Sequence, residues 1–323
     1  MNRPIDEALA ADRPAKRTVR NLWLKEVNKY PGDETHPLYL TLPGAEGKDI
    51  QLLIDNGIVS RTETGAISAE DQKKIVAIES NSEAVLSLQR KFPGLKIRES
   101  AIEGHIGGDG LYNWPNNEIR NDFCARVVNI DLDKPLKASV NGEGVQFPLI
   151  KLIKKISQLH HEPPVGAAKN WSLCVTVNST TQWGKDVSKF FLKYLAINCD
   201  QHPTFKQDMT KTFGQQFVDD LQADNVEPDL NNLSHGTKEK LLCIFLPKII
   251  IDKINDHNWL VEECTSLHYG GTDGHAAMST LTISLCRAQG AATNPAKRYE
   301  TNLGKVIANL GAVDINGTLT RYG

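Results

Sequence analysis

The feature that most constrains the fold is residues 38–50, which read as a short apolar run, a turn of small residues and a helix start. A second predicted strand, 74–79, follows and ends in the carboxylate of Glu79. A strand, a glycine-containing turn, a helix and a second strand that ends in an acid form the nucleotide-binding half of a doubly wound sheet. The sequence therefore predicts an α/β fold whose remaining elements complete and cover that sheet.

Strands and helices continue to alternate along the chain. Residues 124–133 are almost continuously apolar, which is typical of a strand buried on both faces of a parallel sheet. The other strands that we predict in this region are 37–42, 95–100 and 170–178. Apolar residues at helical spacing, with Pro or Gly beyond several of the ends, predict helices over 18–30, 49–56, 82–92, 145–161, 188–196 and 237–254.

The final two strands differ from the others because no helix separates them. Residues 259–269 and 278–287 each alternate between apolar and polar side chains, and a glycine-rich connection joins them. Strands joined without a crossover helix pair in antiparallel fashion. The predicted fold is thus a doubly wound, Rossmann-like, seven-stranded and mostly parallel sheet with a C-terminal antiparallel strand pair and helices on both faces.

The domain organisation follows from changes in composition. Residues 1–17 are polar and alanine-rich, which predicts a flexible N-terminal arm. The α/β domain spans 18–288 and contains a polar segment, 197–236, too long for an ordinary connection and interpreted as a helical insertion or cap. Residues 289–323 form a C-terminal extension without a clear pattern.

Composition excludes several classes of function. The formal net charge of -2 gives no global basic field that would indicate nucleic-acid binding. No apolar run approaches the roughly 20 residues that span a bilayer, and the first residues lack the apolar core of a signal peptide. The six cysteines include no C-x-x-C pair, so we expect buried, reduced thiols and a cytoplasmic protein.

The order of the predicted elements resembles the class I S-adenosylmethionine (SAM) methyltransferase fold over roughly residues 18–288. In that family the last strand inserts antiparallel between the fifth and sixth strands, whereas an NAD-binding Rossmann domain continues with parallel crossovers. The closing pair 259–287 is therefore the feature that favours the methyltransferase family.

The first loop carries part of the resemblance. The family's loop reads acid, apolar residue, then Gly-x-Gly-x-Gly, and the equivalent run begins at Thr41, where an acid is common. Small residues in this loop let a ligand approach the backbone closely. The residues that the resemblance assigns to cofactor binding here are Pro43, Gly44, Ala45 and Gly47, of which Pro43 and Ala45 replace two glycines. The alternative is a structural strand–helix turn.

Two further strand ends complete the predicted SAM site. The family uses an acid after the second strand to hold the ribose hydroxyls, and Glu79, followed by Ser80, matches that place. Two accepting oxygens suit a vicinal diol. After the third strand, Ser100 and Ala101 stand where the family contacts adenine. The structural alternatives for Glu79 are a solvent-exposed strand end and a helix N-cap partner.

The fourth predicted strand supplies the catalytic candidates, Asp131 and Asp133. Asp131 lies at its carboxyl end, where open α/β sheets bind ligands. The run around it also looks like that of metal-dependent O-methyltransferases, whose first acid binds Mg²⁺ and thereby lowers the pKa of an acceptor hydroxyl. No other metal ligand is assigned from the sequence. Both acids also fit loop carboxylates that cap the following turn.

The resemblance implies a SAM-dependent methyltransferase that transfers a methyl group to an O or N nucleophile of an unidentified acceptor. The altered glycine loop favours an alternative, an inactive methyltransferase-like subunit that binds within a larger assembly, with a protein partner or as a homo-oligomer. A third interpretation, an NAD-dependent oxidoreductase, fits the first loop and Glu79 but not the closing strand pair.

Overall fold

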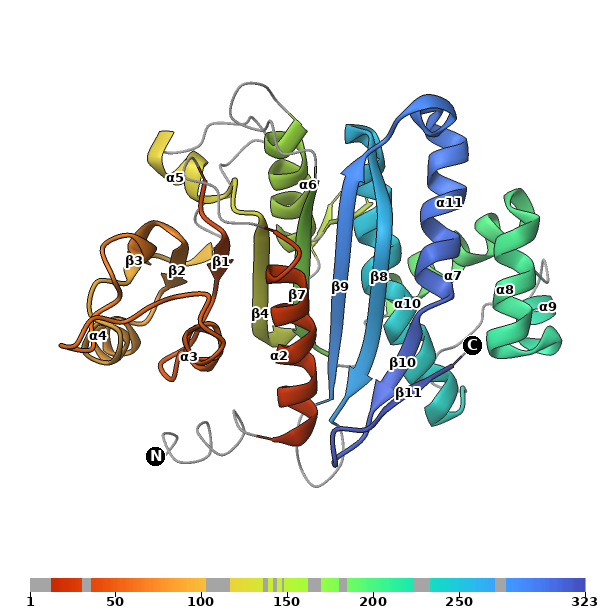
Figure 1. Cartoon of the computed structure of the whole chain (residues 1–323). Helices are drawn as coiled ribbons and strands as arrows, with labels where there is room; N and C mark the ends of the chain where they lie inside the picture. The colour runs from red at the N-terminus through yellow and green to blue at the C-terminus, as the bar shows by residue number, and fades with distance from the viewer. Residues whose placement is uncertain are drawn as a thin grey trace.

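The alternating strands and helices build a nine-stranded mixed sheet with helices on both faces (Figure 1). The structure is a computed structural model, and it describes residues 13–30, 36–102, 117–135, 139–141, 144–146, 148–161, 170–179, 185–222, 233–270 and 277–322. Across the sheet the strands follow the order β11-β10-β8-β9-β7-β4-β1-β2-β3. An α/β fold with a mostly parallel sheet and an antiparallel C-terminal section is therefore confirmed.

The strands of this sheet are β1 (Tyr39–Thr41), β2 (Ile75–Glu79), β3 (Lys96–Glu99), β4 (Val127–Pro135), β7 (Asn170–Asn178), β8 (Trp259–Tyr269), β9 (Met278–Arg287), β10 (Leu310–Val313) and β11 (Leu319–Arg321). A separate hairpin pairs β5 (Ser139–Asn141) with β6 (Gly144–Gln146). The helices are α2 (Pro14–Val27), α3 (Lys48–Asp55), α4 (Ser82–Lys91), α5 (Asn117–Asp122), α6 (Pro148–His161), α7 (Lys185–Gln201), α8 (Pro203–Phe213), α9 (Gln215–Gln222), α10 (His235–Ile254) and α11 (Pro295–Ile307).

Strand β9 runs against its neighbours. It pairs antiparallel with β7 along its whole length, from Met278 opposite Asn178 to Cys286 opposite Asn170. It also pairs antiparallel with β8, with a register shift between Val261 and Glu263. By contrast, β3, β2, β1, β4 and β7 are mutually parallel. The closing strand pair predicted from the sequence is thus present, with β9 inserted between the fifth and sixth strands of the seven predicted.

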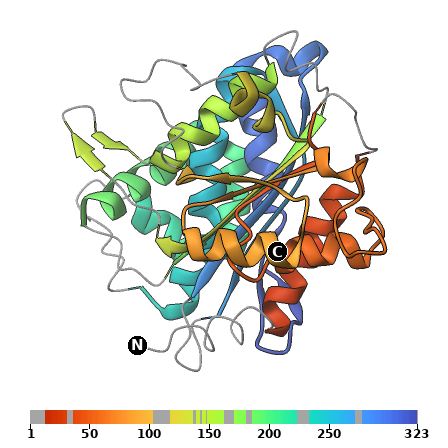
Figure 2. The same ribbon diagram turned by 90° about the vertical axis from the view of Figure 1, so that its left-hand side faces the viewer.

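Alternation along the strands creates one hydrophobic core on each face of the sheet. Tyr39, Ile75 and Val127 point to the face covered by α2, α3 and α4. Their neighbours Leu40 and Val128 point to the other face, where α6, α10 and α11 pack. Figure 2 shows the red and orange helices on one side of the sheet and the green and cyan helices on the other. Central strands that are buried on both faces account for the nearly continuous apolar runs in the sequence.

The predicted count of seven strands is wrong, because the C-terminal extension adds β10 and β11. β10 pairs parallel with β8, and β11 pairs antiparallel with β10. These strands are only four and three residues long, so each carries too little alternation to identify it. Gly311 is a packing requirement of this edge, since a Cβ there would lie 2.4 Å from the carbonyl oxygen of Thr320.

Some predicted boundaries moved. α2 begins at Pro14, within the predicted N-terminal arm, because proline fits the first turn of a helix. The predicted helix 145–161 begins at Pro148, since Val145 belongs to the hairpin strand β6. α8 and α9 lie within the predicted insertion 197–236, while 223–232 is outside the described residues. All six cysteines are free thiols, and all but Cys286 are buried.

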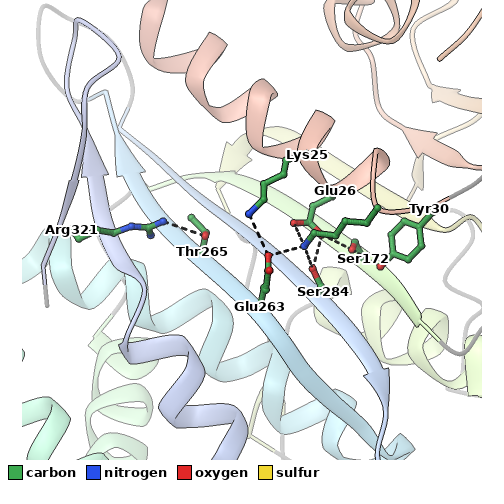
Figure 3. Close-up of polar contacts among 9 residues, drawn as sticks. Lys25, Glu26, Tyr30, Ser172, Glu263, Thr265, Ser284 and Arg321 are labelled. Atoms are coloured by element: carbon green, nitrogen blue, oxygen red, sulfur yellow. Dashed lines mark hydrogen bonds and ion pairs between the residues drawn. The ribbon is translucent and has the colours of Figure 1, made fainter. Parts of the chain in front are cut away.

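A buried carboxylate fixes the C-terminal half of α2 on the sheet (Figure 3). Glu26 is 4% exposed and accepts hydrogen bonds from the hydroxyls of Ser172 at 2.7 Å and Ser284 at 2.6 Å. Lys29 donates to the same carboxylate at 2.8 Å and to Glu263 at 2.8 Å. Burial opposes the charge of Lys29, but its hydrogen bonds to these two carboxylates outweigh burial and raise its pKa. The C-terminal end of α2 is thus held on the sheet, and the helix extends about 20 Å back to its first turn at the opposite edge of the sheet.

Candidate functional site

The point where the strand order reverses lies between β1 and β4. From β1, the chain continues outward through β2 and β3 on one side, and from β4 through β7 on the other. Thr41, the last residue of β1, lies opposite Asn129, so Asp131 extends two residues beyond this pair. In open α/β sheets, ligands bind outside the carboxyl ends of the strands at such a switch point. The first turn of α2 reaches this edge, which is the lower one in Figure 1.

Asp131 forms an ion pair with a lysine from α2. The Nζ atom of Lys16 donates to the two carboxylate oxygens at 2.7 and 2.6 Å, and to the hydroxyl of Tyr269 at 3.3 Å. Lys16 also lies over the ring of Trp23, 5.1 Å from its centroid. Burial favours the neutral amine, but the charges of Asp131 and Tyr269 and the hydrogen bond to Asp131 together outweigh it and raise the pKa of Lys16. The ammonium is therefore a fixed positive charge at the switch point.

A second acid, Asp49, lies at the end of β1. It occupies the first turn of α3, is 6% exposed, and accepts hydrogen bonds from the hydroxyls of Thr41 and Tyr39, the latter at 3.2 Å. Asn129 in turn donates its amide to the Tyr39 hydroxyl at 2.7 Å. Burial raises the pKa of Asp49. Asp49 thus places a buried carboxylate at the end of β1 from the helix that follows the loop.

The loop after β1 contains two glycines with different surroundings. Gly44 has a φ of +58° and is exposed, and a Cβ there would meet nothing within 4 Å. Gly47 has a φ of +52° and is buried. A Cβ there would lie 2.5 Å from the Cε2 atom of Phe92, the residue that follows α4. Gly47 thus permits close packing against α4, whereas Gly44 leaves open space beside the loop.

The side chains of α4 also hold the backbone of this loop. Ser87 donates its hydroxyl to the carbonyl oxygen of Ala45 at 3.2 Å. The ammonium of Lys91 donates to the carbonyl oxygen of Glu46 at 2.7 Å. The predicted cofactor residues Pro43, Gly44, Ala45 and Gly47 are therefore in a loop that α4 fixes, and their role in ligand binding stays a prediction.

Two carboxylates lie at the ends of the neighbouring strands β2 and β3. Glu79 is half-buried and stands opposite Glu99 in the sheet register. Glu79 accepts a hydrogen bond from the backbone N–H of Asn81 at 2.8 Å, and Glu99 accepts one from the hydroxyl of Ser82 at 2.5 Å. The Asn81 side chain caps α4, as the sequence predicted. Both carboxylates are therefore bound by neutral donors, and both retain capacity to accept from ligand hydroxyls.

The remaining predicted residues follow these strand ends. Ser80 and Ala101 are exposed, and Ser100 donates its backbone N–H to the carbonyl oxygen of Glu79 at 3.0 Å. Asp133 belongs to β4, beyond Asp131 and within the register shift toward β7, but its side chain is outside the described residues. The predicted residues thus come together along one edge of the sheet, as the carboxyl ends of parallel strands.

Sequence reasoning missed Lys16, Asp49, Tyr269 and Glu99. Lys16 was assigned to the flexible arm, and only the tertiary position of α2 brings it to Asp131. Asp49 carried a usable signal, since it is an acid two residues after the loop glycine Gly47. The chain onward from this edge, at 103–116, 136–138, 180–184 and 271–276, lies outside the described residues.

Metal binding at Asp131 stays a prediction. Within the residues that the structure describes, no group of three or more His, Cys, Asp or Glu side chains could hold a metal ion. The same residues include no helix that is both long and apolar enough to cross a membrane.

Comparisons with known proteins assign no family to this chain. No protein-family model matches the chain, and no curated protein sequence matches it either. One matching solved structure comes from Rhodobacter sphaeroides and is described, provisionally, as a Zn-dependent alcohol dehydrogenase. It is 9% identical, the match covers 84% of this chain and 98% of the other, and the TM-score is 0.30. At this TM-score the likeness carries no argument about activity.

Proposed function

We propose that this protein is a SAM-dependent methyltransferase that transfers a methyl group to an O or N nucleophile. The single observation that carries the proposal is the direction of β9, which runs antiparallel between β7 and β8 while the strands from β3 to β7 are parallel. This strand order is the one that the methyltransferase resemblance implies. A sheet continued by parallel crossovers, as in NAD-binding Rossmann domains, would place a parallel strand beside β7.

The residues present at the carboxyl edge fit an adenosine-bearing ligand. Glu79 ends β2 as a half-buried carboxylate that can accept from two ribose hydroxyls. Ser100 and Ala101 follow β3, next to it, where adenine would lie. The open space beside Gly44 gives the ligand access to the loop backbone. The amino-acid end of the ligand would then extend toward β1 and β4.

When bound, SAM supplies an electrophilic methyl carbon, which bonds to the acceptor O or N while the electron pair of the broken C–S bond remains on sulfur. The chain orients the two reactants and accepts the proton that the acceptor loses. Asp131 and Asp133 are our candidates for the base that accepts this proton, because they lie at the end of β4 beside the switch point. Positioning of the two reactants supplies most of the remaining rate enhancement.

A second candidate function, an inactive subunit that binds within a larger assembly or as a homo-oligomer, is favoured by one observation. The carboxylate of Asp131 is already paired with Lys16, as expected of an acid that no longer takes part in catalysis. Asp131→Ala separates the two candidates, because at a saturating concentration of SAM it should abolish methyl transfer while SAM still binds. Methyl transfer that survives this change would contradict the catalytic role of Asp131.

Isothermal titration of the full chain tests the proposed ligand. We expect SAM to bind with a stoichiometry of one in this titration. In a separate mixing experiment, we expect the fluorescence of NADH to stay unchanged when the protein is added. Binding of NADH without binding of SAM would instead favour the oxidoreductase. Absence of binding by either compound would favour the inactive subunit.

A further inference from the structure

A positive charge stands at the switch point of the sheet. The ammonium of Lys16 has three hydrogens, and it lies 2.7 and 2.6 Å from the two oxygens of Asp131. The third contact, to the Tyr269 hydroxyl, is longer at 3.3 Å. The Lys16 and Asp131 side chains are 15% and 21% exposed, so the pair is not sealed from ligands. A second anion can therefore replace one of these contacts without separating the pair.

The surroundings of Lys16 add to its positive charge. Arg20 follows one helical turn later on the same face of α2. Its charge acts on Asp49 and Tyr269, in each case against the larger effect of burial, which raises the pKa of both groups. Lys16 and Arg20 thus place two cations of α2 at this edge of the sheet.

The other end of the site has the opposite character. Glu79 and Glu99 end β2 and β3 and accept hydrogen bonds from a backbone N–H and a hydroxyl, both neutral donors. Such carboxylates suit ligand hydroxyls. A ligand that matches both ends carries hydroxyl groups at one end and an anionic group at the other.

We propose that Lys16 binds the carboxylate at the amino-acid end of the methyl donor, with Asp131 and Tyr269 holding its ammonium in place. This inference rests on the proposed function, because it places the donor ribose at Glu79. Lys16 is thus a donor-binding residue contributed by the helix that precedes the sheet. It distinguishes an adenosine that carries an amino acid from one that does not.

The experiment compares two ligands in matched variants by isothermal titration. S-adenosylhomocysteine carries the amino-acid carboxylate, whereas 5′-methylthioadenosine shares the adenosine and lacks the amino acid. In Lys16→Met, we expect affinity for S-adenosylhomocysteine to fall about tenfold to a hundredfold, as for loss of a charged hydrogen bond. Affinity for 5′-methylthioadenosine should not change, and Lys16→Arg should restore most of the discrimination.

Lys25→Met is the matched control. It makes the same change on the same helix, but Lys25 pairs with Glu263 at 3.4 Å and the two side chains are 64% and 58% exposed. Neither affinity should change in this variant. Partial unfolding of Lys16→Met would reduce the number of binding sites rather than the ratio of the two dissociation constants.

Three results would overturn the inference. An unchanged affinity for S-adenosylhomocysteine in Lys16→Met would show that Lys16 does not bind its carboxylate. An equal loss for both ligands would assign Lys16 a structural role only. If the unaltered protein bound neither ligand, the donor assignment itself would fail, and that outcome is distinguishable from the first two.

Discussion

Gly47→Ala tests how the loop at the end of β1 is built. The backbone at Gly47 has a φ of +52°, which costs an L-residue about 1–2 kcal/mol. The added Cβ would also lie 2.5 Å from Phe92 and 3.0 Å from Leu88. Overpacking of this kind costs about 1–3 kcal/mol. We therefore expect the free energy of unfolding to fall by about 2–5 kcal/mol, measured by urea denaturation.

Gly44→Ala is the matched variant in the same loop. Its φ of +58° imposes the same backbone cost, but its Cβ would enter open space. The expected loss is only about 1–2 kcal/mol. The new methyl group would occupy the space beside the loop where we place the donor, so SAM affinity should fall in this variant. Equal losses of stability in the two variants would refute the packing argument for Gly47.

The remaining predictions concern three acids. Glu26→Ala should lower the free energy of unfolding by about 1–3 kcal/mol, because it removes the buried acceptor shared by Ser172 and Ser284 while Lys29 keeps its ion pair with Glu263. Glu263→Ala should cost less than about 1 kcal/mol, and similar losses in urea denaturation would contradict the role of Glu26. Burial raises the pKa of Asp49 in the folded protein above its value in the unfolded chain, which is about 4. Protonation of Asp49 therefore favours the folded state fully below about pH 4, and this contribution to the free energy of unfolding is lost as the pH rises through the pKa of the folded state. The melting temperature of the unaltered protein relative to Asp49→Asn should therefore fall between pH 3 and pH 7, and a constant difference would refute the burial effect. Glu79→Ala should weaken SAM binding in isothermal titration and leave the melting temperature nearly unchanged; an equal loss of stability would indicate a structural acid.

The strands could be predicted from the sequence where burial leaves a long pattern. β7, β8 and β9 have the predicted bounds, since each is at least nine residues long with apolar positions in register with a core. β10 and β11 could not be predicted, because pairing of so few residues depends on the neighbouring strand, β8 for β10 and β10 for β11, rather than on their own side chains. The local sequence pattern therefore predicts the strands that the core buries but does not predict the short edge strands β10 and β11.

The candidate site was predictable only where it depends on strand ends. Glu79 and Asp131 follow apolar runs, so the topology of a parallel sheet places them at one edge. Lys16 reaches the same edge from a helix that precedes the sheet, and its pairing with Asp131 spans 115 positions in the chain. No local pattern encodes that contact, because the packing of α2 across the sheet determines it.

A crystal structure of the protein with S-adenosylhomocysteine would test the central claim most directly. We predict that the ribose hydroxyls bind Glu79 and that the amino-acid end reaches the ends of β1 and β4, with its carboxylate at Lys16. A ligand bound away from the carboxyl edge of the sheet, or a saturating soak that leaves this edge empty, would contradict a methyl-donor site at the switch point.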